Sequence, residues 1–295
     1  MWNCDSMPDQ QGRTFVVTGG NTGIGLAAVK ALASKRAKVI LACRNLDKGN
    51  AALAVIKASQ GDADVIVAKL DLASLASVAE FADWCTANLP RIDVLINNAG
   101  VMDMPLSWTA DGFEMHFGTN VLGHFALTGR LLPLLCNASG SRIVTMSSVG
   151  HWFGKLEFDN LAAEKPYSKT AAYAQSKLAN LVFAYELQRR LARAGSTSIS
   201  VGAHPGVTSS DLGRNSMSSK IALRLYGQSA LNGALPALMG ATSPDIKGGD
   251  YVGPGGFMTF KGPPTVQKSR ALSHDIELGK KLWDKAQEMT HYSYL

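Results

Sequence analysis

The regular alternation of two kinds of segment is the feature that most constrains how this chain folds. Short apolar runs rich in Val, Ile and Leu alternate with amphipathic stretches of helix length, and the turns between them are brief. This alternation predicts a parallel sheet covered by helices. Because the strands are continuous apolar runs, both faces of the sheet should be buried. We therefore expect an α/β fold with a Rossmann-type, doubly wound parallel β-sheet and helices on both faces, which binds ligands beyond the carboxyl ends of its strands.

The expected elements follow one another along the whole chain. The predicted strands are Phe15–Thr18, Lys38–Ala42, Val65–Lys69, Asp93–Asn97, Arg142–Ser147 and Ser198–Ala203, with a last short strand within Gly248–Pro264. The predicted helices are Gly23–Lys35, Leu46–Ser59, Ser74–Asn88, Asn120–Cys136, Ala171–Ala194 and Ile276–Met289. No linker rich in Pro, Gly or Ser divides the chain before Gly206, so residues 1–295 should form a single domain. Residues 209–240 are mixed in character and are expected to form an excursion that covers the substrate.

Composition narrows the classes of partner. The chain has 295 residues, of which 46% are hydrophobic and 18% charged, as in ordinary globular proteins. Met1–Gly12 has no apolar core of signal-peptide type, and no apolar run reaches the roughly 18 residues that a membrane helix needs. The net charge of +6 is spread along the chain, which suits a polyanionic cofactor better than nucleic acid. The four cysteines are scattered and suggest reduced thiols. We expect a cytoplasmic protein without a metal, nucleic-acid or membrane partner.

A glycine-rich stretch follows directly after the first predicted strand. It reads Thr18-Gly19-Gly20-Asn21-Thr22-Gly23-Ile24-Gly25 and opens the first predicted helix. Glycines there permit a tight turn and close approach of the backbone to a pyrophosphate. The helix N-terminus offers N–H groups and a positive dipole end to the phosphates. A glycine cluster alone also fits a plain turn, but its position at the start of a βαβ unit indicates a dinucleotide site.

The end of the second predicted strand bears on which dinucleotide binds. An enzyme that uses NAD usually has an acidic residue there, on the hydroxyls of the adenosine ribose. Here the strand runs into Arg44 and Asn45, with no acidic residue. A guanidinium suits bidentate binding of a 2′-phosphate, although an exposed Arg in such a loop can also lack a ligand. The sequence favours NADP(H).

Tyr173 and Lys177 form the clearest candidate for acid–base chemistry. They are four residues apart in a helical stretch, so they lie on one helix face. A phenol titrates near pH 10, and a nearby ammonium lowers that pKa by favouring the phenolate. Such a pair can exchange a proton during alcohol–carbonyl interconversion. The same spacing is common in helices that have no catalytic role.

Further motifs accompany the pair in a fixed order. Asn97-Asn98-Ala99-Gly100 follows the fourth strand, and Ser147-Ser148 follows the fifth. With the glycine turn and the Tyr–Lys pair, they make the chain resemble the short-chain dehydrogenase/reductase family from about Thr14 to Thr208. Within that family, short motifs such as Leu41-Ala42-Cys43-Arg44 look like those of the retinol-dehydrogenase branch. The photoenzymes that reduce protochlorophyllide share these motifs. They carry a cysteine where this chain has Val207, which argues against a photoenzyme.

The resemblance implies a role for each matching residue. Tyr173 would exchange the proton, Ser148 would hydrogen-bond the substrate carbonyl oxygen, and Asn120 would support a water that relays protons to Lys177. Composition alone does not choose between Ser147 and Ser148, and the family alignment favours Ser148. The implied cofactor contacts are Gly19, Asn21, Thr22, Gly23, Ile24, Gly25, Arg44, Asp71, Leu72, Asn98, Ala99, Gly100, Tyr173, Lys177, Pro205, Gly206, Val207 and Thr208.

The substrate is less constrained. The insertion Val149–Thr170 is rich in aromatic residues, and with Met102, Met104 and Met217–Tyr226 it is hypothesised to wall an apolar pocket for a bulky ketone, aldehyde or alcohol. Many retinol dehydrogenases carry a membrane-anchoring N-terminal helix; we expect none in this protein, which argues against a retinoid as its substrate. A reductase of carbon–carbon double bonds and a non-catalytic NADP(H)-sensing module remain as alternatives. Whether the chain forms a homo-oligomer stays open.

Overall fold

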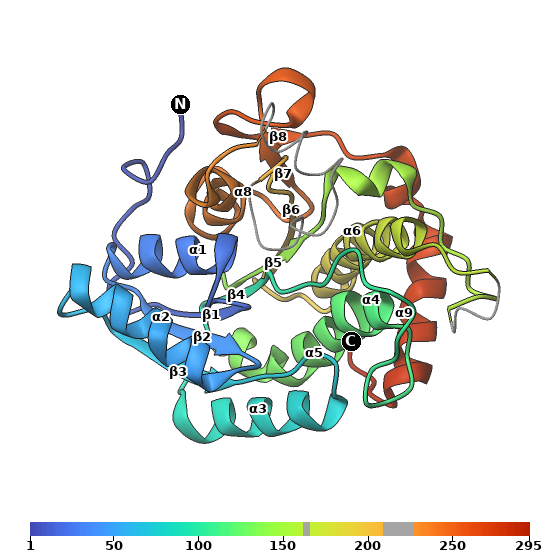
Figure 1. Cartoon of the computed structure of the whole chain (residues 1–295), viewed down its shortest axis with the longest axis horizontal. Coiled ribbons are helices and arrows are strands. Elements are labelled where there is room, and N and C mark those ends of the chain that lie inside the picture. The colour runs from blue at the N-terminus through green and yellow to red at the C-terminus, as the bar shows by residue number, and fades with distance from the viewer. Residues whose placement is uncertain (162–165, 209–226) are drawn as a thin grey trace.

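One eight-stranded sheet runs through the centre of the molecule (Figure 1). The computed structural model describes residues 1–161, 166–208 and 227–295. The strands lie in the order β3-β2-β1-β4-β5-β6-β7-β8, parallel from β3 to β7, and β8 is antiparallel to β7. Their bounds are β1 Thr14–Thr18, β2 Lys38–Cys43, β3 Val65–Lys69, β4 Val94–Asn97, β5 Arg142–Met146, β6 Ile199–Ala203, β7 Tyr251–Pro254 and β8 Pro264–Gln267. The doubly wound α/β fold is confirmed.

Helices cover both faces of this sheet. The α-helices of the described residues are α1 Gly23–Ala33, α2 Leu46–Ser59, α3 Leu75–Asn88, α4 Met115–Phe117, α5 Gly123–Cys136, α6 Lys169–Arg193, α8 Ala230–Thr242 and α9 Ile276–Thr290. Strand side chains point alternately to the two faces. Phe15 and Val17 pack with α1, α2 and α8, whereas Val16 packs with α3, α5 and α6. Both layers are largely apolar where they meet the sheet, which explains the continuous apolar strands.

Polar side chains fix where several helices begin. Asn45 Oδ1 accepts a hydrogen bond from the Lys48 N–H at 2.9 Å and caps α2. Ser168 caps α6 and Asp275 caps α9 in the same way. Such caps satisfy N–H groups that have no partner within the helix. The cap on α6 matters for the site, because it fixes the first turn of the helix that carries Tyr173.

The structure corrects three details of the predicted elements. A π-helical turn, Gly118–Leu122, precedes α5, so Asn120 lies within a wide turn and does not begin a regular helix. Strand β8 was not expected. Residues 230–240 of the expected excursion belong to α8, which packs on α1 and on the sheet, while residues 209–226 lie outside the described residues. The segment 230–240 is therefore part of the helical layer.

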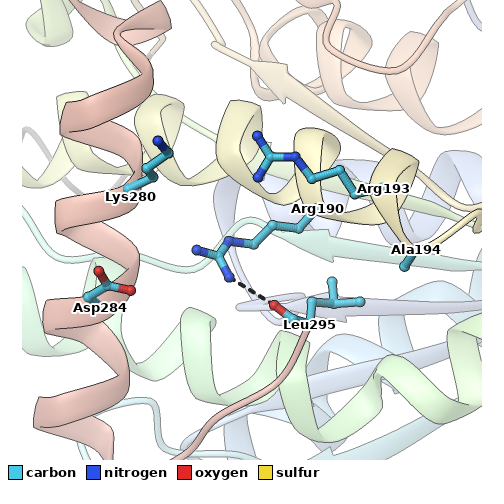
Figure 2. Close-up of a pocket in the computed structure, with 6 residues that line it drawn as sticks. All are labelled: Arg190, Arg193, Ala194, Lys280, Asp284 and Leu295. Carbon is cyan, nitrogen blue, oxygen red and sulfur yellow. Dashed lines mark hydrogen bonds between the residues drawn. The ribbon is translucent and has the colours of Figure 1, made fainter.

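The C-terminal helix covers the outer side of α5 and α6. Trp283 is buried, with its ring centroid 5.1 Å from that of Phe125 and 6.0 Å from that of Phe183. A shallow hollow between the end of α6 and α9 is lined by basic side chains (Figure 2). In it Arg190 Nη1 donates to the carbonyl oxygen of Leu295 at 2.8 Å. This hollow lies at the opposite end of α6 from Tyr173. None of the described helices is long and apolar enough to cross a membrane.

Candidate active site

A cavity of about 310 Å³ opens where β1, β2 and β4 end. At β1 the strand order reverses direction, with β2 on one side and β4 on the other. Sheets of this type bind ligands at such a switch point. The cavity is lined by Thr18, Gly19, Asn21, Thr22, Gly23, Ile24, Gly25, Cys43, Arg44, Leu70, Asp71, Leu72, Asn98, Ala99, Gly100, Val101, Thr119, Met146, Ser147, Tyr173, Lys177 and Pro205. Most of the predicted cofactor contacts are therefore brought together in one place.

The glycine turn at one side of the cavity leaves no room for side chains. A Cβ at Gly25 would lie 2.2 Å from the Gly19 carbonyl oxygen and 2.6 Å from Asn98 Nδ2. Gly19 has φ +66°, a conformation that L side chains rarely adopt. The turn leads into α1, whose N-terminal end carries the positive end of the helix dipole. This tight turn fits a dinucleotide, because its backbone can approach a pyrophosphate closely.

The Thr18 side chain holds the turn against the next motif. Its Oγ1 accepts hydrogen bonds from the N–H groups of Asn98 and Ala99, both at 2.9 Å. The side chain of Asn98 returns a bond to the Thr18 carbonyl oxygen at 2.8 Å. These bonds join the carboxyl ends of β1 and β4. They also explain why the two motifs, which are far apart in the sequence, shape one wall.

The other end of the cavity is rimmed by the loops after β2 and β3. Arg44 follows β2, and Asp71 and Leu72 follow β3. Asp71 Oδ1 accepts from the Ala73 N–H at 3.0 Å, which fixes the loop beside the predicted adenine position. Cys43 is the register partner of Lys69, so a second cation ends the strand next to Arg44. This rim therefore carries the Arg44 guanidinium and the Asp71 carboxylate, with Lys69 at the end of the neighbouring strand.

Tyr173 and Lys177 line one end of the cavity, and Ser148 contacts Tyr173 there. The hydroxyl of Tyr173 is hydrogen-bonded to the Ser148 side chain, and Lys177 Nζ lies 5.7 Å from the centre of the Tyr173 ring. Lys177 is buried, and its Nζ donates to the Met146 carbonyl oxygen at 3.2 Å. Two elements supply these groups, the loop after β5 and two successive turns of α6. The predicted constellation is thus assembled in space.

Burial dominates the protonation of this pair. Burial raises the pKa of Tyr173, and the hydrogen bond from Ser148 offsets this only in part. Burial lowers the pKa of Lys177 to about 8. The expectation that the ammonium lowers the pKa of Tyr173 is therefore wrong for the protein without a cofactor. Desolvation is the largest cause for both groups, because burial removes the water that would stabilise the charged form of each.

Asn120 sits behind the cavity wall and braces it. Its Oδ1 accepts from the Val101 N–H at 2.8 Å, and its Nδ2 donates to the Val101 carbonyl oxygen at 3.0 Å and to Ser176 Oγ at 2.9 Å. Ser176 Oγ in turn donates to the Tyr173 carbonyl oxygen at 2.8 Å. A Cβ on Gly100 would touch both Asn120 and Lys177. Asn120 is therefore close to Lys177, as its predicted role requires.

The two adjacent serines have different surroundings. Ser147 is buried, and its hydroxyl donates to the Lys177 carbonyl oxygen at 2.8 Å, which ties β5 to α6. Ser148 begins a 3₁₀ turn, Val149–Phe153, and its Oγ accepts from the Gly150 N–H at 3.1 Å while contacting Tyr173. Only the hydroxyl of Ser148 faces the tyrosine. The geometry thus distinguishes two residues that composition could not.

The segment after β6 borders the cavity through Pro205. Thr208 Oγ1 and Gln228 Nε2 both donate to the Pro205 carbonyl oxygen, at 2.8 and 2.7 Å. The Val207 N–H donates to the Phe260 carbonyl oxygen at 2.8 Å, and Gly206 has φ +65°. Gly206, Val207 and Thr208 therefore shape the wall from behind, whereas Pro205 reaches the cavity. Gln228, which the sequence did not single out, is the polar side chain that holds this loop.

Some of the side chains expected to wall a substrate pocket pack elsewhere. Leu156 and Phe158 contact the helical layer that contains α5 and α6, and Lys281 on α9 lies over the Phe158 ring at 4.6 Å. Tyr167 donates to Glu114 Oε1 at 2.9 Å. These residues fasten the insertion to the body of the protein. Met217–Tyr226 lies outside the described residues.

Sequence reasoning also missed residues that line the cavity. They are Thr18, Cys43, Leu70, Val101, Thr119, Met146 and Ser147. Most of them end a strand or stand one position away from a motif residue. The rule that ligands bind beyond strand ends was the signal that could have found them, since every strand end near the switch point contributes to the wall.

Comparison with known proteins identifies the family. A family model described as short chain dehydrogenase matches residues 13–220, well over half of the chain. The chain belongs to the short-chain dehydrogenase family. It falls within the retinol-dehydrogenase-like branch: retinol dehydrogenase 11 of Mus musculus is 50% identical over 213 residues, which cover 72% of this chain and 67% of that protein. The resemblance inferred from the motifs is confirmed.

Solved structures of short-chain dehydrogenases and their relatives share this fold. The crystal structure of an uncharacterized protein from Mycobacterium paratuberculosis has a TM-score of 0.85 and 38% identity, covering 100% of this chain and 99% of that one. A short-chain dehydrogenase from Shigella flexneri 2a, solved in complex with NADP, has a TM-score of 0.65 and 22% identity over 83% of this chain and 98% of that one. At that identity the second likeness shows the fold alone.

Proposed function

We propose that this chain is an NADP(H)-dependent oxidoreductase that interconverts an apolar or bulky ketone or aldehyde and its alcohol, with Tyr173 as general acid and base. The observation that supports it most is the contact of the Tyr173 hydroxyl with Ser148, beside the buried Lys177, at one end of the cavity. A hydroxyl in that position can reach the oxygen of a carbonyl held over a nicotinamide. When bound, the dinucleotide supplies or accepts the hydride.

The protonation of Tyr173 favours its use as an acid. Because burial raises the pKa of Tyr173, the phenol keeps its proton at neutral pH. In reduction Tyr173 Oη gives this proton to the carbonyl oxygen as negative charge develops there, while Ser148 Oγ–H holds the same oxygen. In oxidation Tyr173 must first lose the proton. Oxidation should therefore quicken as the pH rises, and reduction should slow once the phenol ionises.

Lys177 is suited to resupply the proton. Burial lowers the pKa of Lys177 to about 8, so the amine can lose and regain a proton near neutral pH more easily than an exposed lysine. Its Nζ–H group is anchored on the Met146 carbonyl oxygen, which keeps it beside Tyr173. Asn120 lies close to Nζ from behind the wall. These contacts support a relay in which Lys177 passes to Tyr173 a proton taken from a water that Asn120 would hold.

Charge at the cavity rim supports NADP(H) over NAD(H). Arg44 lines the cavity, and Lys69 ends the neighbouring strand. Asn45 uses its side chain to cap α2, so it is engaged with the backbone. A guanidinium with a second cation nearby suits the doubly charged 2′-phosphate, which it can bind through two parallel hydrogen bonds.

The substrate class rests on the relatives and on the loops. Curated relatives at 37–50% identity are retinol dehydrogenases by name, and retinol is a long apolar alcohol. Exposed apolar side chains, Trp108, Trp152 and Phe153, lie on the loops that precede α4 and follow β5. Such exposed apolar side chains support an apolar substrate.

A carbonyl panel tests the proposal directly. Purified protein would be assayed with NADPH and with NADH against all-trans-retinaldehyde, a bulky aromatic ketone and a small polar sugar, with product analysis to distinguish a reduced carbonyl from a reduced carbon–carbon bond. We expect turnover with NADPH and the apolar carbonyls, and an alcohol as product. Activity confined to sugars, or reduction of a carbon–carbon bond alone, would overturn it.

A further inference from the structure

A buried histidine links the two motifs of the candidate active site. His124 lies in α5, just after the π-helical turn, and is 1% exposed. One ring nitrogen, Nε2, lies 3.0 Å from Thr18 Oγ1, and the other, Nδ1, lies 3.0 Å from the Asn120 carbonyl oxygen. No other side chain named in the proposed mechanism connects these two residues. His124 does not line the cavity, so it cannot act on the substrate itself.

The hydrogen-bond partners fix the tautomer of this ring. A carbonyl oxygen only accepts, so Nδ1 of His124 must carry a hydrogen. Burial, with the nearby Lys177 charge as a smaller cause, lowers the pKa of His124 to about 4, so the ring is neutral at physiological pH. Nε2 therefore has no hydrogen and accepts from the Thr18 hydroxyl. Donors and acceptors match at both ends of the ring.

The Thr18 end leads to the cofactor wall. Thr18 Oγ1 accepts from the Asn98 and Ala99 N–H groups, which occupies both lone pairs. Its single hydrogen can go to His124 Nε2 at 3.0 Å or to the Ile96 carbonyl oxygen at 3.4 Å. The shorter contact is the stronger. His124 thus orients the hydroxyl so that its lone pairs face the two N–H groups that shape the wall.

The Asn120 end leads to the proton relay. The carbonyl of Asn120 belongs to the wide π-helical turn, where backbone bonds run over five residues; the Gly123 N–H donates to the Gly118 carbonyl oxygen. His124 Nδ1–H donates to the Asn120 carbonyl oxygen from the following turn. Gly123 lets the start of α5 lie close against the loop after β3, because a Cβ at this position would lie 2.4 Å from the Leu72 carbonyl oxygen.

We propose that His124 is a positioning residue that couples the dinucleotide wall, through Thr18, to the relay residue Asn120. The ring is a rigid spacer with one acceptor and one donor on opposite sides. Through Thr18 it sets the geometry of the N–H groups of Asn98 and Ala99, and through Asn120 it sets the turn that supports Lys177. The consequence at Asn120 rests on the whole of the proposed function, whereas the consequence at Thr18 rests on its cofactor, NADP(H), and not on its reaction.

Two variants can separate the two ends. In His124→Asn the shorter amide keeps a donor at the position of Nδ1 and cannot reach Thr18. In His124→Gln the longer amide reaches Thr18 and leaves the Asn120 carbonyl oxygen unpaired. His124→Phe keeps a planar ring of similar size and loses both bonds. Leu131→Ala, a buried change two turns along α5, serves as the control for loss of stability alone.

The readouts are the Kd for NADPH, from fluorescence titration without substrate, and kcat. We expect His124→Asn to raise the Kd roughly tenfold and to lower kcat by no more than about threefold. We expect His124→Gln to lower kcat roughly tenfold and to raise the Kd by no more than about threefold. His124→Phe should both raise the Kd for NADPH and lower kcat. Leu131→Ala should lower the unfolding midpoint and leave the Kd and kcat unchanged. Equal losses in all three His124 variants that follow their unfolding midpoints, or wild-type values in all three, would overturn the proposal.

Nuclear magnetic resonance of the ¹⁵N-labelled imidazole decides the tautomer independently of turnover. We expect a hydrogen on Nδ1 and none on Nε2 at neutral pH; the opposite tautomer, or a charged ring, overturns the proposal. If the wild-type protein binds NADPH but reduces no carbonyl, the proposed function fails. The NADPH affinities of the variants and the tautomer then still decide the role of His124.

Discussion

Replacing Gly25 by alanine should damage dinucleotide binding in a way that can be calculated from the turn. The new Cβ would lie 2.2 Å from the Gly19 carbonyl oxygen and 2.6 Å from Asn98 Nδ2. Both neighbouring atoms are fixed in place. The Gly19 carbonyl oxygen belongs to the backbone of the turn, and Asn98 Nδ2 donates a hydrogen bond to the Thr18 carbonyl oxygen. Neither can move without opening the wall of the cavity. Overpacking of this kind typically costs about 1–3 kcal/mol. If this strain is relieved by a turn that no longer fits the dinucleotide, the Kd for NADPH rises about 5- to 150-fold.

Two other glycines provide graded controls for the same titration. A Cβ on Gly61 meets nothing within 4 Å, so Gly61→Ala should bind NADPH like the wild type. A Cβ on Gly20 would lie 3.0 Å from the side chains of Leu41 and Val29, which can shift slightly, so Gly20→Ala should have an intermediate effect. The Kd from fluorescence titration should increase in the order Gly61, Gly20, Gly25. Equal affinities of the Gly25 and Gly61 variants would refute the steric reasoning.

Three further substitutions test other parts of the account. Arg44→Asp should lower kcat/KM with NADPH roughly 10- to 100-fold and raise the ratio of NADH to NADPH activity. The reason is that the change removes a charge-assisted hydrogen bond and places a carboxylate where it repels the 2′-phosphate. An unchanged ratio would count against Arg44 as the residue that binds the 2′-phosphate. For Lys177 the folded pKa of about 8 lies below the unfolded value of 10.5, so the unfolded chain binds more protons between these values and stability rises with pH there. Lys177→Met should abolish this rise and stabilise the cofactor-free protein near neutral pH by on the order of 2 kcal/mol, measured by urea unfolding; a variant that keeps the rise contradicts the origin of the shift. Trp283→Ala should cost about 3–5 kcal/mol of unfolding free energy while leaving the NADPH affinity of the folded protein unchanged, and a parallel loss of affinity would show that α9 supports the site.

The strands near the centre of the sheet could be predicted to within about one residue. Their apolar runs are set by burial on both faces, which leaves a signal in local sequence. Strand β8 could not be predicted in this way. It begins at Pro264, and Thr265 and Val266 are exposed, so its existence depends on pairing with β7 at the edge of the sheet. A proline at the first position of an edge strand is tolerated because no ladder hydrogen bond is needed there.

The lining of the cavity was largely predictable, whereas its electrostatics were not. Motif residues end neighbouring parallel strands, so their convergence follows from the fold. The pKa of Tyr173 depends on how much water the folded chain removes, and spacing along a helix carries no information about this. In the same way, the partners of His124 come from β1 and from the π-helical turn, and only the tertiary structure brings them within hydrogen-bond distance.

The loops on the substrate side were the least predictable part. Aromatic residues between Ser148 and Tyr173 indicated an apolar wall, but Leu156 and Phe158 pack on the helical layer. A hydrophobic side chain in a long insertion is needed to hold the insertion down, and the same residue type would serve to bind a ligand. Composition does not separate the two uses.

Replacement of Tyr173 by phenylalanine tests whether the Tyr173 hydroxyl is the general acid. The change removes one oxygen, and with it the bond to Ser148, while the ring that lines the cavity stays. The measurement is paired: NADPH affinity by fluorescence titration, and the rate of carbonyl reduction with NADPH under the same conditions. The account predicts an NADPH Kd close to that of the wild type and a rate lowered at least about a hundredfold, as expected on loss of a general acid. A rate equal to that of the wild type would contradict it.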